Sequence, residues 1–276
     1  MHPYLLALIG GALIGVSAVL LMAFCGRIAG ISGIVGGLLP PRPADDLAWR
    51  VAFIVGLLLA PVMLALFTGD DRIGAPTVGP VLLIAAGFLV GAGTALGRRR
   101  RDLHGGCDGD RLRRSSRSLR EAVIMREIVA ALLTGFIFGL GLCLSSMTNP
   151  AVVQGFLDIA GAWNPTLAFV MAGGVAVTFV GYRMILPRGR PLWAPRFSLP
   201  AATAIDAPLL SGAAIFGVGW GLAGYCPGPA VVSLASGRTA VLIFVLAMLT
   251  GMIFVRWMRT RLSATMPQTP VQERSA

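Results

Sequence analysis

Long apolar segments alternate with short, arginine-rich polar segments along this chain. Seven apolar runs are long enough to cross a bilayer as helices, for which about 20 residues suffice. They lie at Tyr4–Phe24, Leu47–Phe67, Gly79–Leu96, Ile128–Leu144, Thr166–Ile185, Pro208–Gly224 and Thr239–Trp257. Backbone polar groups in lipid must be satisfied within their own segment, so each run is expected to be helical. The pattern predicts an all-α, polytopic membrane protein with about seven spanning helices.

Three shorter apolar segments, rich in small residues, follow some of these runs. They lie at Gly30–Leu39, Ala151–Ala160 and Ala230–Ser236. At roughly ten residues or fewer, they are too short to span a bilayer. They are predicted to be re-entrant half-helices; ordinary interfacial loops are the alternative.

The charged residues fit a membrane protein better than a protein that binds nucleic acid. Of 276 residues, 56% are hydrophobic and 13% are charged, and the net charge is +11. All of the basic residues are Arg, since the chain contains no Lys. Because these arginines stand in short segments between apolar runs, as in cytoplasmic loops, the predicted surroundings are a lipid bilayer and not nucleic acid.

The same arginines predict an orientation in a bacterial inner membrane. Segments 98–120 and 183–196 are arginine-rich, and three more arginines end the last apolar run, which places all three regions in the cytoplasm. Segment 68–78 holds two Asp and one Arg and is predicted to lie outside. With seven spans, the N-terminus is outside and the C-terminus is cytoplasmic. The first apolar run lacks a basic start and a cleavage site, so it is interpreted as a span and not as a signal peptide.

A unit of helix, break and half-helix recurs along the sequence. Fourteen residues separate Gly11 from Cys25, Gly212 from Cys226, and the glycine at 135 from Asn149. The predicted orientation puts the first break inside and the other two outside. We therefore expect residues 1–119 and 120–262 to be inverted halves of a membrane domain, followed by a disordered cytoplasmic tail at 263–276. Inverted repeats are typical of transporters that hold their substrate near the midplane.

The residues at the breaks are the candidates for substrate binding. Cys25 and Cys226 are predicted to stand at the entrance to half-helices, where free N–H groups and the helix dipole favour an anion. Cys143 precedes the third break and could face the same path. The alternative for each thiol is a small buried hydrophobe. Asn149 offers a neutral donor, and Gly228 would allow the backbone to approach a ligand closely.

Other polar residues have less specific interpretations. Cys107 lies beside His104 in the arginine-rich segment, where a solvated loop is favoured over a metal site. The four cysteines match neither a zinc spacing nor a disulfide framework, so no metal and no cofactor is predicted. Arg27 and Arg238 are the charges nearest the breaks. They would steer anions or extend to the lipid headgroups.

Several motifs resemble the YeeE/YedE family of bacterial inner-membrane proteins, which handle sulfur compounds and include thiosulfate carriers. The likeness covers nearly the whole chain and is strongest from Gly135 to Gly237. The motifs that carry it include Cys25-Gly-Arg-Ile-Ala-Gly-Ile-Ser-Gly33, Ser146-Met-Thr-Asn-Pro150 and Gly217-Val-Gly-Trp-Gly-Leu-Ala-Gly-Tyr-Cys-Pro-Gly-Pro229. The resemblance implies that Cys226, and with it Cys25, passes thiosulfate along through S–H···S contacts. One departure is clear: the family has a cysteine-bearing motif after the position of Gly97, where this chain has Arg98–Arg101.

The sequence therefore predicts a carrier or channel for a small sulfur-containing anion, either thiosulfate or a related persulfide or sulfide species. An enzyme is not expected, because the chain has no Walker-type motif and only two His, at 2 and 104, for a haem or quinone site. The alternative is a membrane component that hands sulfur to a cytoplasmic sulfurtransferase without net uptake.

Overall fold

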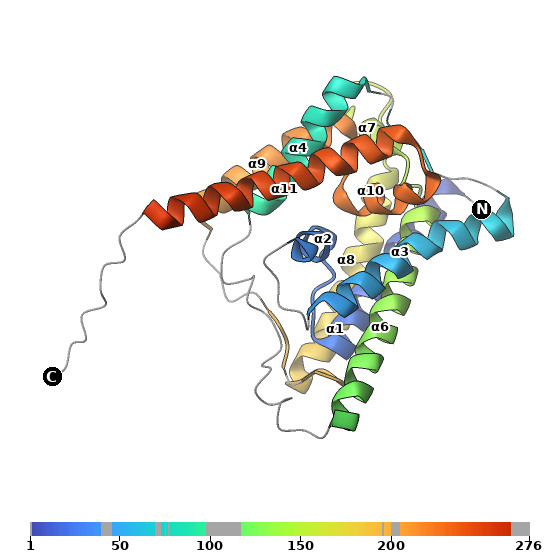
Figure 1. Ribbon diagram of the computed structural model, residues 1–276. Coiled ribbons are helices and arrows are strands. Elements are labelled where there is room, and N and C mark those ends of the chain that lie inside the picture. Colours follow the sequence, from blue (N-terminus) through green and yellow to red (C-terminus); the bar gives the residue numbers. More distant parts are fainter. Residues whose placement is uncertain are drawn as a thin grey trace.

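Helices form all of the regular secondary structure in the part of the chain that the computed structural model describes (Figure 1). The described residues are 2–39, 46–69, 73–74, 76, 78–97, 117–194, 196–199 and 205–265. The long helices are α1 (Pro3–Cys25), α3 (Leu47–Thr68), α4 (Pro80–Leu96), α6 (Arg117–Leu144), α8 (Thr166–Ile185), α9 (Ala207–Ala223) and α11 (Thr239–Thr265). Each of the seven predicted spans is thus a helix.

Five of these helices are long and apolar enough to cross a membrane on their own: α1, α3, α6, α8 and α11. A sixth candidate is α9 together with α10, the short helix that follows it at an angle of 43°. Helix α4 is apolar but has 17 residues. The predicted all-α, polytopic membrane fold is confirmed.

The three predicted half-helices are also helical. They are α2 (Ile31–Leu38), α7 (Pro150–Leu157) and α10 (Pro227–Ser233), the last continued by the 3-10 turn η4 (Leu234–Ser236). Helices α7 and α10 both begin with proline, whose fixed φ suits the first helical position. These segments are therefore helices and not irregular loops. A further 3-10 turn, η3 (Leu186–Arg188), extends α8.

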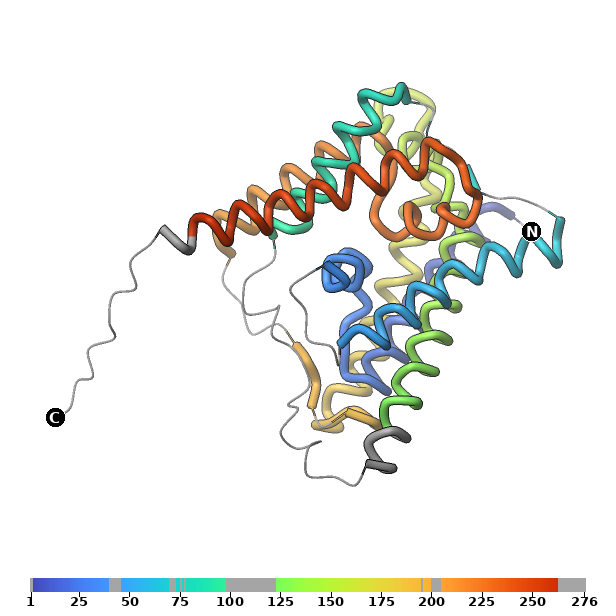
Figure 2. The backbone as a smooth tube through the Cα atoms, in the orientation of Figure 1, coloured from blue at the N-terminus to red at the C-terminus, as the bar shows by residue number. Residues whose placement is uncertain are grey.

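The long helices form two groups, seen in Figures 1 and 2. In the first group, α1 packs against α6 and α8, and α3 packs against α6. In the second group, α4 packs against both α9 and α11. Helix α10 contacts α3 and α6 of the first group, α11 of the second, and α2. The half-helices α2 and α10 thus lie where the two groups meet.

Glycines bring paired helices into backbone contact. A Cβ at Gly87 of α4 would lie 2.6 Å from the carbonyl oxygen of Phe244 in α11. At Gly139 of α6 it would lie 2.7 Å from the carbonyl oxygen of Leu57 in α3. Small residues serve this purpose in membranes, where lipid is as apolar as the helix surfaces and close packing must supply the attraction.

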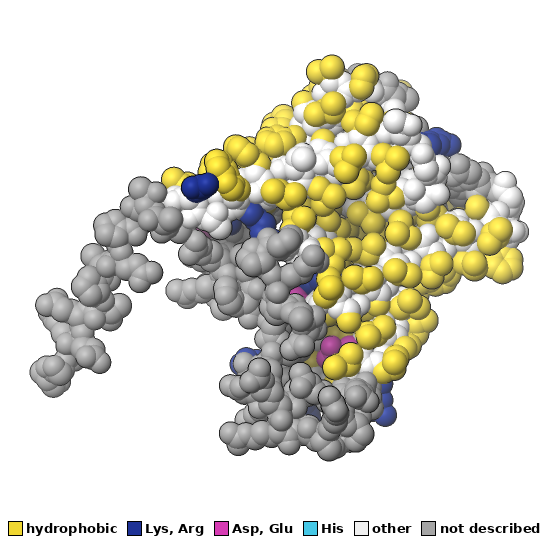
Figure 3. Space-filling model, viewed as in Figure 1, with side chains coloured by type: hydrophobic (Ala, Val, Ile, Leu, Met, Phe, Trp, Pro, Cys, Tyr) yellow, Lys and Arg dark blue, Asp and Glu magenta, His cyan; other side chains and the backbone are white. Residues whose placement is uncertain are grey.

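Hydrophobic side chains cover much of the outer surface on the face in Figure 3. Exposed apolar side chains include Phe67 in α3, Val81 in α4, Phe179 in α8 and Leu246 in α11. A lipid-facing surface of this kind agrees with a multi-pass membrane protein.

Helices from one predicted half pack against helices from the other. Helices α1 and α3 come from residues 1–119 and pack against α6 and α8, which come from residues 120–262. Helix α4 likewise packs against α9 and α11. The inverted relation between the halves stays a prediction. Residues 98–116 and 266–276, which include much of the arginine-rich segment and most of the predicted tail, lie outside the described residues.

Candidate functional site

The break between α9 and α10 places Cys226 at the start of a half-helix, as predicted. Helix α9 ends at Gly224, whose φ of 68° is left-handed and whose N–H bonds the carbonyl of Trp220 at 2.8 Å. Glycine adopts this conformation without steric cost and commonly ends helices. Cys226 is the N-cap residue of α10, has extended backbone and is half-buried.

Prolines limit what the start of α10 can offer an anion. Pro227 and Pro229 have no N–H, and the N–H of Ala230 already bonds the carbonyl of Cys226 at 3.1 Å. Among the first residues of α10 the N–H of Gly228 remains, and it is a hydrogen-bond donor to the Cys226 sulfur. The expectation of several free N–H groups is therefore wrong for this half-helix.

Gly228 also marks where three elements converge. A Cβ at Gly228 would lie 3.1 Å from Cδ1 of Ile31 and 3.6 Å from Cδ1 of Leu142. Ile31 is the first residue of α2, and Leu142 precedes Cys143 near the end of α6. The starts of two half-helices thus meet beside the end of a long helix.

The other two described thiols are buried in the core. Cys143 is 1% exposed and Cys25 is 3% exposed, and both belong to the same hydrophobic cluster as Ala230 and Val231 of α10. None of the three described cysteines forms a disulfide. Cys107 lies outside the described residues. Burial keeps the alternative of a packing role open for Cys25 and Cys143.

Cys25 does not stand at the entrance to a half-helix, and that part of the prediction is wrong. It is the last residue of α1, whereas the N-cap of α2 is Gly30. The reason is the position of the left-handed glycine. Gly26 (φ 66°) follows Cys25, whereas Gly224 precedes Cys226. Equal spacing in the sequence therefore puts the two cysteines on different sides of the helix end.

Asn149 has a structural role at the third break. It is the N-cap of α7, and its side-chain oxygen accepts the N–H of Ala151 at 3.1 Å. Helix α6 ends before it at Leu144, and Ser146 in the following turn is left-handed (φ 57°). The N–H of Met147 bonds Leu142 and that of Ser146 bonds Cys143, each at 3.1 Å, which is a Schellman motif. An amide keeps two N–H donors besides its oxygen, so a role of Asn149 toward an anion stays a hypothesis.

The breaks at 145–149 and 224–226 lie against each other. A Cβ at Gly224 would lie 2.6 Å from the carbonyl oxygen of Pro150. The hydroxyl of Tyr225 bonds the carbonyl oxygens of Thr148 and Gly74, at 3.2 and 3.0 Å. Residues 73–74, which belong to the segment predicted to lie outside, therefore adjoin both of these breaks.

The first break has a different neighbour. The N–H groups of Leu192, Trp193 and Ser198 bond the carbonyls of Ala23, Phe24 and Gly26 at 2.9, 3.1 and 2.8 Å. The described residues of segment 191–198 thus cover the end of α1, and the ring of Trp193 stacks on that of Phe24. This segment borders the region predicted to be cytoplasmic. The first break and the later two adjoin connecting segments that the arginine pattern assigns to opposite sides.

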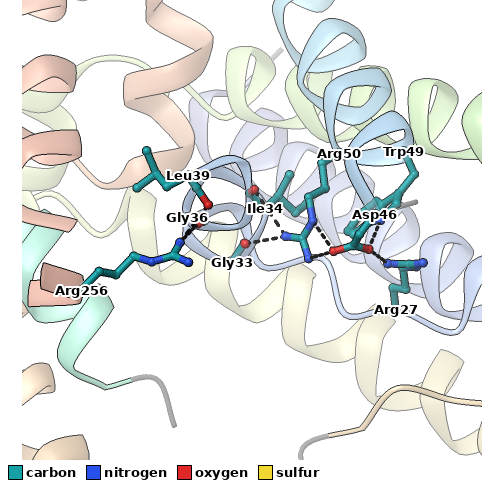
Figure 4. A network of polar contacts seen from close by, with 9 residues as sticks. All are labelled: Arg27, Gly33, Ile34, Gly36, Leu39, Asp46, Trp49, Arg50 and Arg256. Atoms are coloured by element: carbon teal, nitrogen blue, oxygen red, sulfur yellow. Dashed lines mark hydrogen bonds and ion pairs between the residues drawn. The ribbon is translucent and has the colours of Figure 1, made fainter. Parts of the chain in front are cut away.

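A buried charge cluster holds the region between α1 and α3 (Figure 4). Asp46, which precedes α3, accepts hydrogen bonds from Trp49 Nε1 at 2.6 Å and from Arg50 Nε at 2.8 Å. It also pairs with the guanidinium of Arg27. Both guanidinium groups lie over the ring of Trp49, at 4.4 and 4.8 Å from its centroid. Arg27 is therefore buried in an ion pair, and does not extend to the headgroups.

The Asp46 carboxylate remains charged in this setting. Burial alone would raise its pKa. The hydrogen bond from Trp49 and the charges of Arg27 and Arg50 outweigh that effect and hold the pKa below the ordinary 3.8. We call Asp46, Arg27, Trp49 and Arg50 the Asp46 cluster.

Arginines from both helix groups bond carbonyl groups of α2 (Figure 4). Arg50 of α3 donates to the carbonyl of Gly33 at 2.7 Å. Arg256 of α11 donates to the carbonyls of Gly36 and Leu39 at 2.9 and 3.1 Å. Gly33 stands in the first turn of α2, whereas Gly36 and Leu39 lie at its C-terminal end. The last carbonyls of a helix lack partners within it and carry the negative end of its dipole, so the guanidinium of Arg256 stabilises that end.

Sequence reasoning did not identify this polar network. It assigned Arg256 only to membrane orientation and gave Asp46 no role. One local signal was present, because Asp46 stands three and four residues before Trp49 and Arg50, a spacing at which helical side chains meet. Nothing local pointed to Arg27 or Arg256, since their partners are remote in sequence. Within the described residues, no group of three or more His, Cys, Asp and Glu is placed to hold a metal.

Comparison with known proteins identifies the family of this chain. Residues 125–266 match the Family of unknown function (DUF6691). A protein of Xylella fastidiosa strain Temecula1, named "Probable transporter", is 50% identical over 46% of this chain and 86% of its own length. One from strain 9a5c with the same name is 50% identical over 46% and 88%. A second protein of strain Temecula1, also so named, is 42% identical over 35% of this chain and 70% of its own length. No solved structure shows significant similarity. This multi-pass membrane protein belongs to the Family of unknown function (DUF6691).

Proposed function

We propose that this membrane protein transports a small sulfur-containing anion, thiosulfate or a related persulfide or sulfide species. The observation that carries the proposal is the convergence at Gly228, where the starts of α10 and α2 meet the end of α6 beside Cys226 and Cys143. Helix breaks in a membrane protein are tolerated where they are buried or line a path. The relatives named "Probable transporter" support the general function.

The chemistry at this point suits a soft anion. Cys226 is the half-buried thiol at the N-cap of α10, and the N–H of Gly228 follows it. A thiol is polarizable and is a weak donor, so it meets a sulfur atom at lower desolvation cost than a charged side chain would. Cys143 and Cys25 would provide two further thiols, both buried in the core. The amide of Asn149 is a further donor in the proposed site.

The choice of thiosulfate rests on the resemblance to the YeeE/YedE family, and the orientation in the membrane rests on the arginine pattern. In the proposed arrangement, in a bacterial inner membrane with the N-terminus outside, the anion enters near residues 73–74 and leaves near the end of α1, close to segment 191–198. A cytoplasmic sulfurtransferase is the proposed acceptor of the sulfur. Arg98–Arg101 replace the family's second cysteine motif, so Cys226 would carry the main role here.

The test is uptake of sulfur-labelled thiosulfate by cells that lack other sulfur importers. Expression of the chain is expected to give uptake, and Cys226→Ser is expected to lower it about tenfold (~1.4 kcal/mol). The reason is that a hard hydroxyl oxygen replaces the polarizable sulfur. Cys107→Ser, in the arginine-rich segment, is the matched control and should leave uptake unchanged. Uptake that survives Cys226→Ser unaltered would exclude the thiol contact.

The same strains separate transport from sulfur hand-off. Absence of uptake with the native chain, together with a persulfide on Cys226 after exposure to a loaded sulfurtransferase, would favour a component that passes sulfur without net import. Uptake without any persulfide would favour a carrier with non-covalent contacts.

A further inference from the structure

Tyr225 connects three segments that are far apart in the sequence. It lies between the left-handed Gly224 and Cys226 and is fully buried. Its hydroxyl reaches the carbonyl oxygens of Gly74 at 3.0 Å and Thr148 at 3.2 Å, which stand 151 and 77 residues away along the chain. Its ring packs edge-on against Phe244 of α11, with 5.5 Å between the centroids. The ring of Tyr225 thus packs against α11, while its hydroxyl links the break to Gly74 and Thr148.

The hydroxyl has one proton for two carbonyl acceptors. It must share that proton between Gly74 and Thr148 or donate to each in turn. A buried carbonyl that loses its hydrogen-bond donor costs free energy. The hydroxyl of Tyr225 therefore holds the segments of Gly74 and Thr148 against the break. Nearby contacts reinforce this arrangement. Gly74 lies against the side chain of Asn149, and Gly224 lies against the backbone of Pro150.

These contacts fix the residue that follows Tyr225. Cys226 is directly bonded to Tyr225 and precedes Pro227, whose ring restricts the backbone of the residue before it. The backbone of Cys226 can therefore move appreciably only if the break itself moves away from Thr148 and Gly74.

We propose that Tyr225 is a positioning residue for Cys226: its hydroxyl holds the α9–α10 break closed against the α6–α7 break and residues 73–74. This inference rests on the proposed function for the meaning of the thiol, but the position itself can be tested without substrate. Loosening the bond exposes Cys226 on the side of residues 73–74, and tightening it shields the thiol.

The test measures the rate at which a maleimide modifies Cys226 in the purified full-length protein, with the other three cysteines replaced by Ser. Tyr225→Phe keeps the ring against Phe244 and removes the hydroxyl. It is expected to raise the modification rate about tenfold. Tyr182→Phe in α8 is the matched control and should leave the rate unchanged. An unchanged rate in Tyr225→Phe would overturn the proposal.

A second variant acts from the other side of the bond, and serves if Tyr225→Phe fails to accumulate. A Cβ at Gly74 would lie 2.5 Å from the side-chain oxygen and 2.7 Å from the Cα of Asn149, so Gly74→Ala must push residue 74 and the Asn149 break apart. It should raise the rate as well, and the double variant should add little to either single change, because both break one link. Fully additive effects would contradict a shared link.

Uptake measurements distinguish this inference from the proposed function. If Tyr225→Phe raises Cys226 modification and raises the KM for thiosulfate more than it lowers kcat, both stand. If modification rises while uptake is indifferent to Tyr225→Phe and to Cys226→Ser, the positioning role stands and the thiol-dependent transport fails. If modification does not rise, the positioning role fails whatever the uptake.

Discussion

Replacing Asp46 by Asn removes the negative charge at the centre of the Asp46 cluster. The native carboxylate bonds Trp49 and Arg50 and pairs with Arg27, and its side chain is 15% exposed, so solvent screens it little. Hydrogen bonds to charged groups contribute about 1.5–3 kcal/mol each. In Asp46→Asn the amide oxygen can still accept a hydrogen bond from one of these three partners. The amide NH₂ group, however, faces another N–H donor and cannot accept from it. Arg50 keeps its hydrogen bond to the carbonyl of Gly33. We expect a loss of about 3 kcal/mol, near the lower end for breaking one partner of a buried pair.

The assay is thermal unfolding in detergent, followed by tryptophan fluorescence. For a chain of this size each kcal/mol shifts Tm by about 2–4 °C, so Asp46→Asn should lower Tm by about 6–12 °C. Asp206→Asn is the matched control. Asp206 is the N-cap of α9 and accepts the N–H of Leu209 at 3.1 Å, a role in which Asn is as good as Asp. A Tm unchanged in Asp46→Asn would refute the reasoning that this cluster stabilises the fold.

The pH dependence identifies the charge as the cause. Because the folded pKa of Asp46 is depressed below 3.8, its contribution is complete above the unfolded value and is lost as the pH falls through the folded pKa. The Tm difference between the native chain and Asp46→Asn should therefore be constant from about pH 5 to 8 and shrink below about pH 4. A difference that persists unchanged to pH 3 would show that shape, and not charge, is responsible.

Two further predictions concern packing and backbone strain. Gly87→Ala should lower Tm, since its Cβ would lie 2.6 Å from the carbonyl oxygen of Phe244 and overpacking costs about 1–3 kcal/mol. Gly217→Ala, with nothing within 4 Å, is its control and should be neutral or slightly stabilising; equal Tm values for the two variants would contradict the close contact of α4 and α11. Ser146→Gly should raise Tm by a few degrees, because Ser146 has φ 57° and a left-handed non-glycine residue costs about 1 kcal/mol or more. A lower Tm would mean that the serine side chain stabilises the break more than its backbone costs.

Helix positions followed from the sequence because they depend on local hydrophobicity. The first apolar run, predicted at Tyr4–Phe24, is helix α1 at Pro3–Cys25. Helices α6 and α11 extend beyond their apolar runs, to Arg117 and Thr265, because good helix formers such as Arg and Leu continue the helix outside the apolar stretch. Apolarity predicts where a helix can cross lipid, and does not mark its end.

Helix pairing could not be predicted, because it depends on the surfaces of remote segments. Helices of one half pack against helices of the other through contacts such as that between Gly87 of α4 and Phe244 of α11. No local sequence pattern indicates such a contact. The candidate site was predicted in part. Cys226 stands where the break motif placed it, whereas Cys25 ends α1, since a shift of one glycine relative to the cysteine moves the helix end. The link from Tyr225 to Gly74 and Thr148 joins three distant segments and has no sequence signature.

The most direct test of the central claim is whether thiosulfate protects the Cys226 thiol. Cys226 is the only cysteine in the variant that replaces the other three, and its modification by a maleimide is timed in the reconstituted protein. The account predicts that thiosulfate slows the reaction in a saturable manner, whereas sulfate at the same concentration does not. Equal rates with thiosulfate, with sulfate and with neither anion would contradict the claim that this thiol contacts the transported anion.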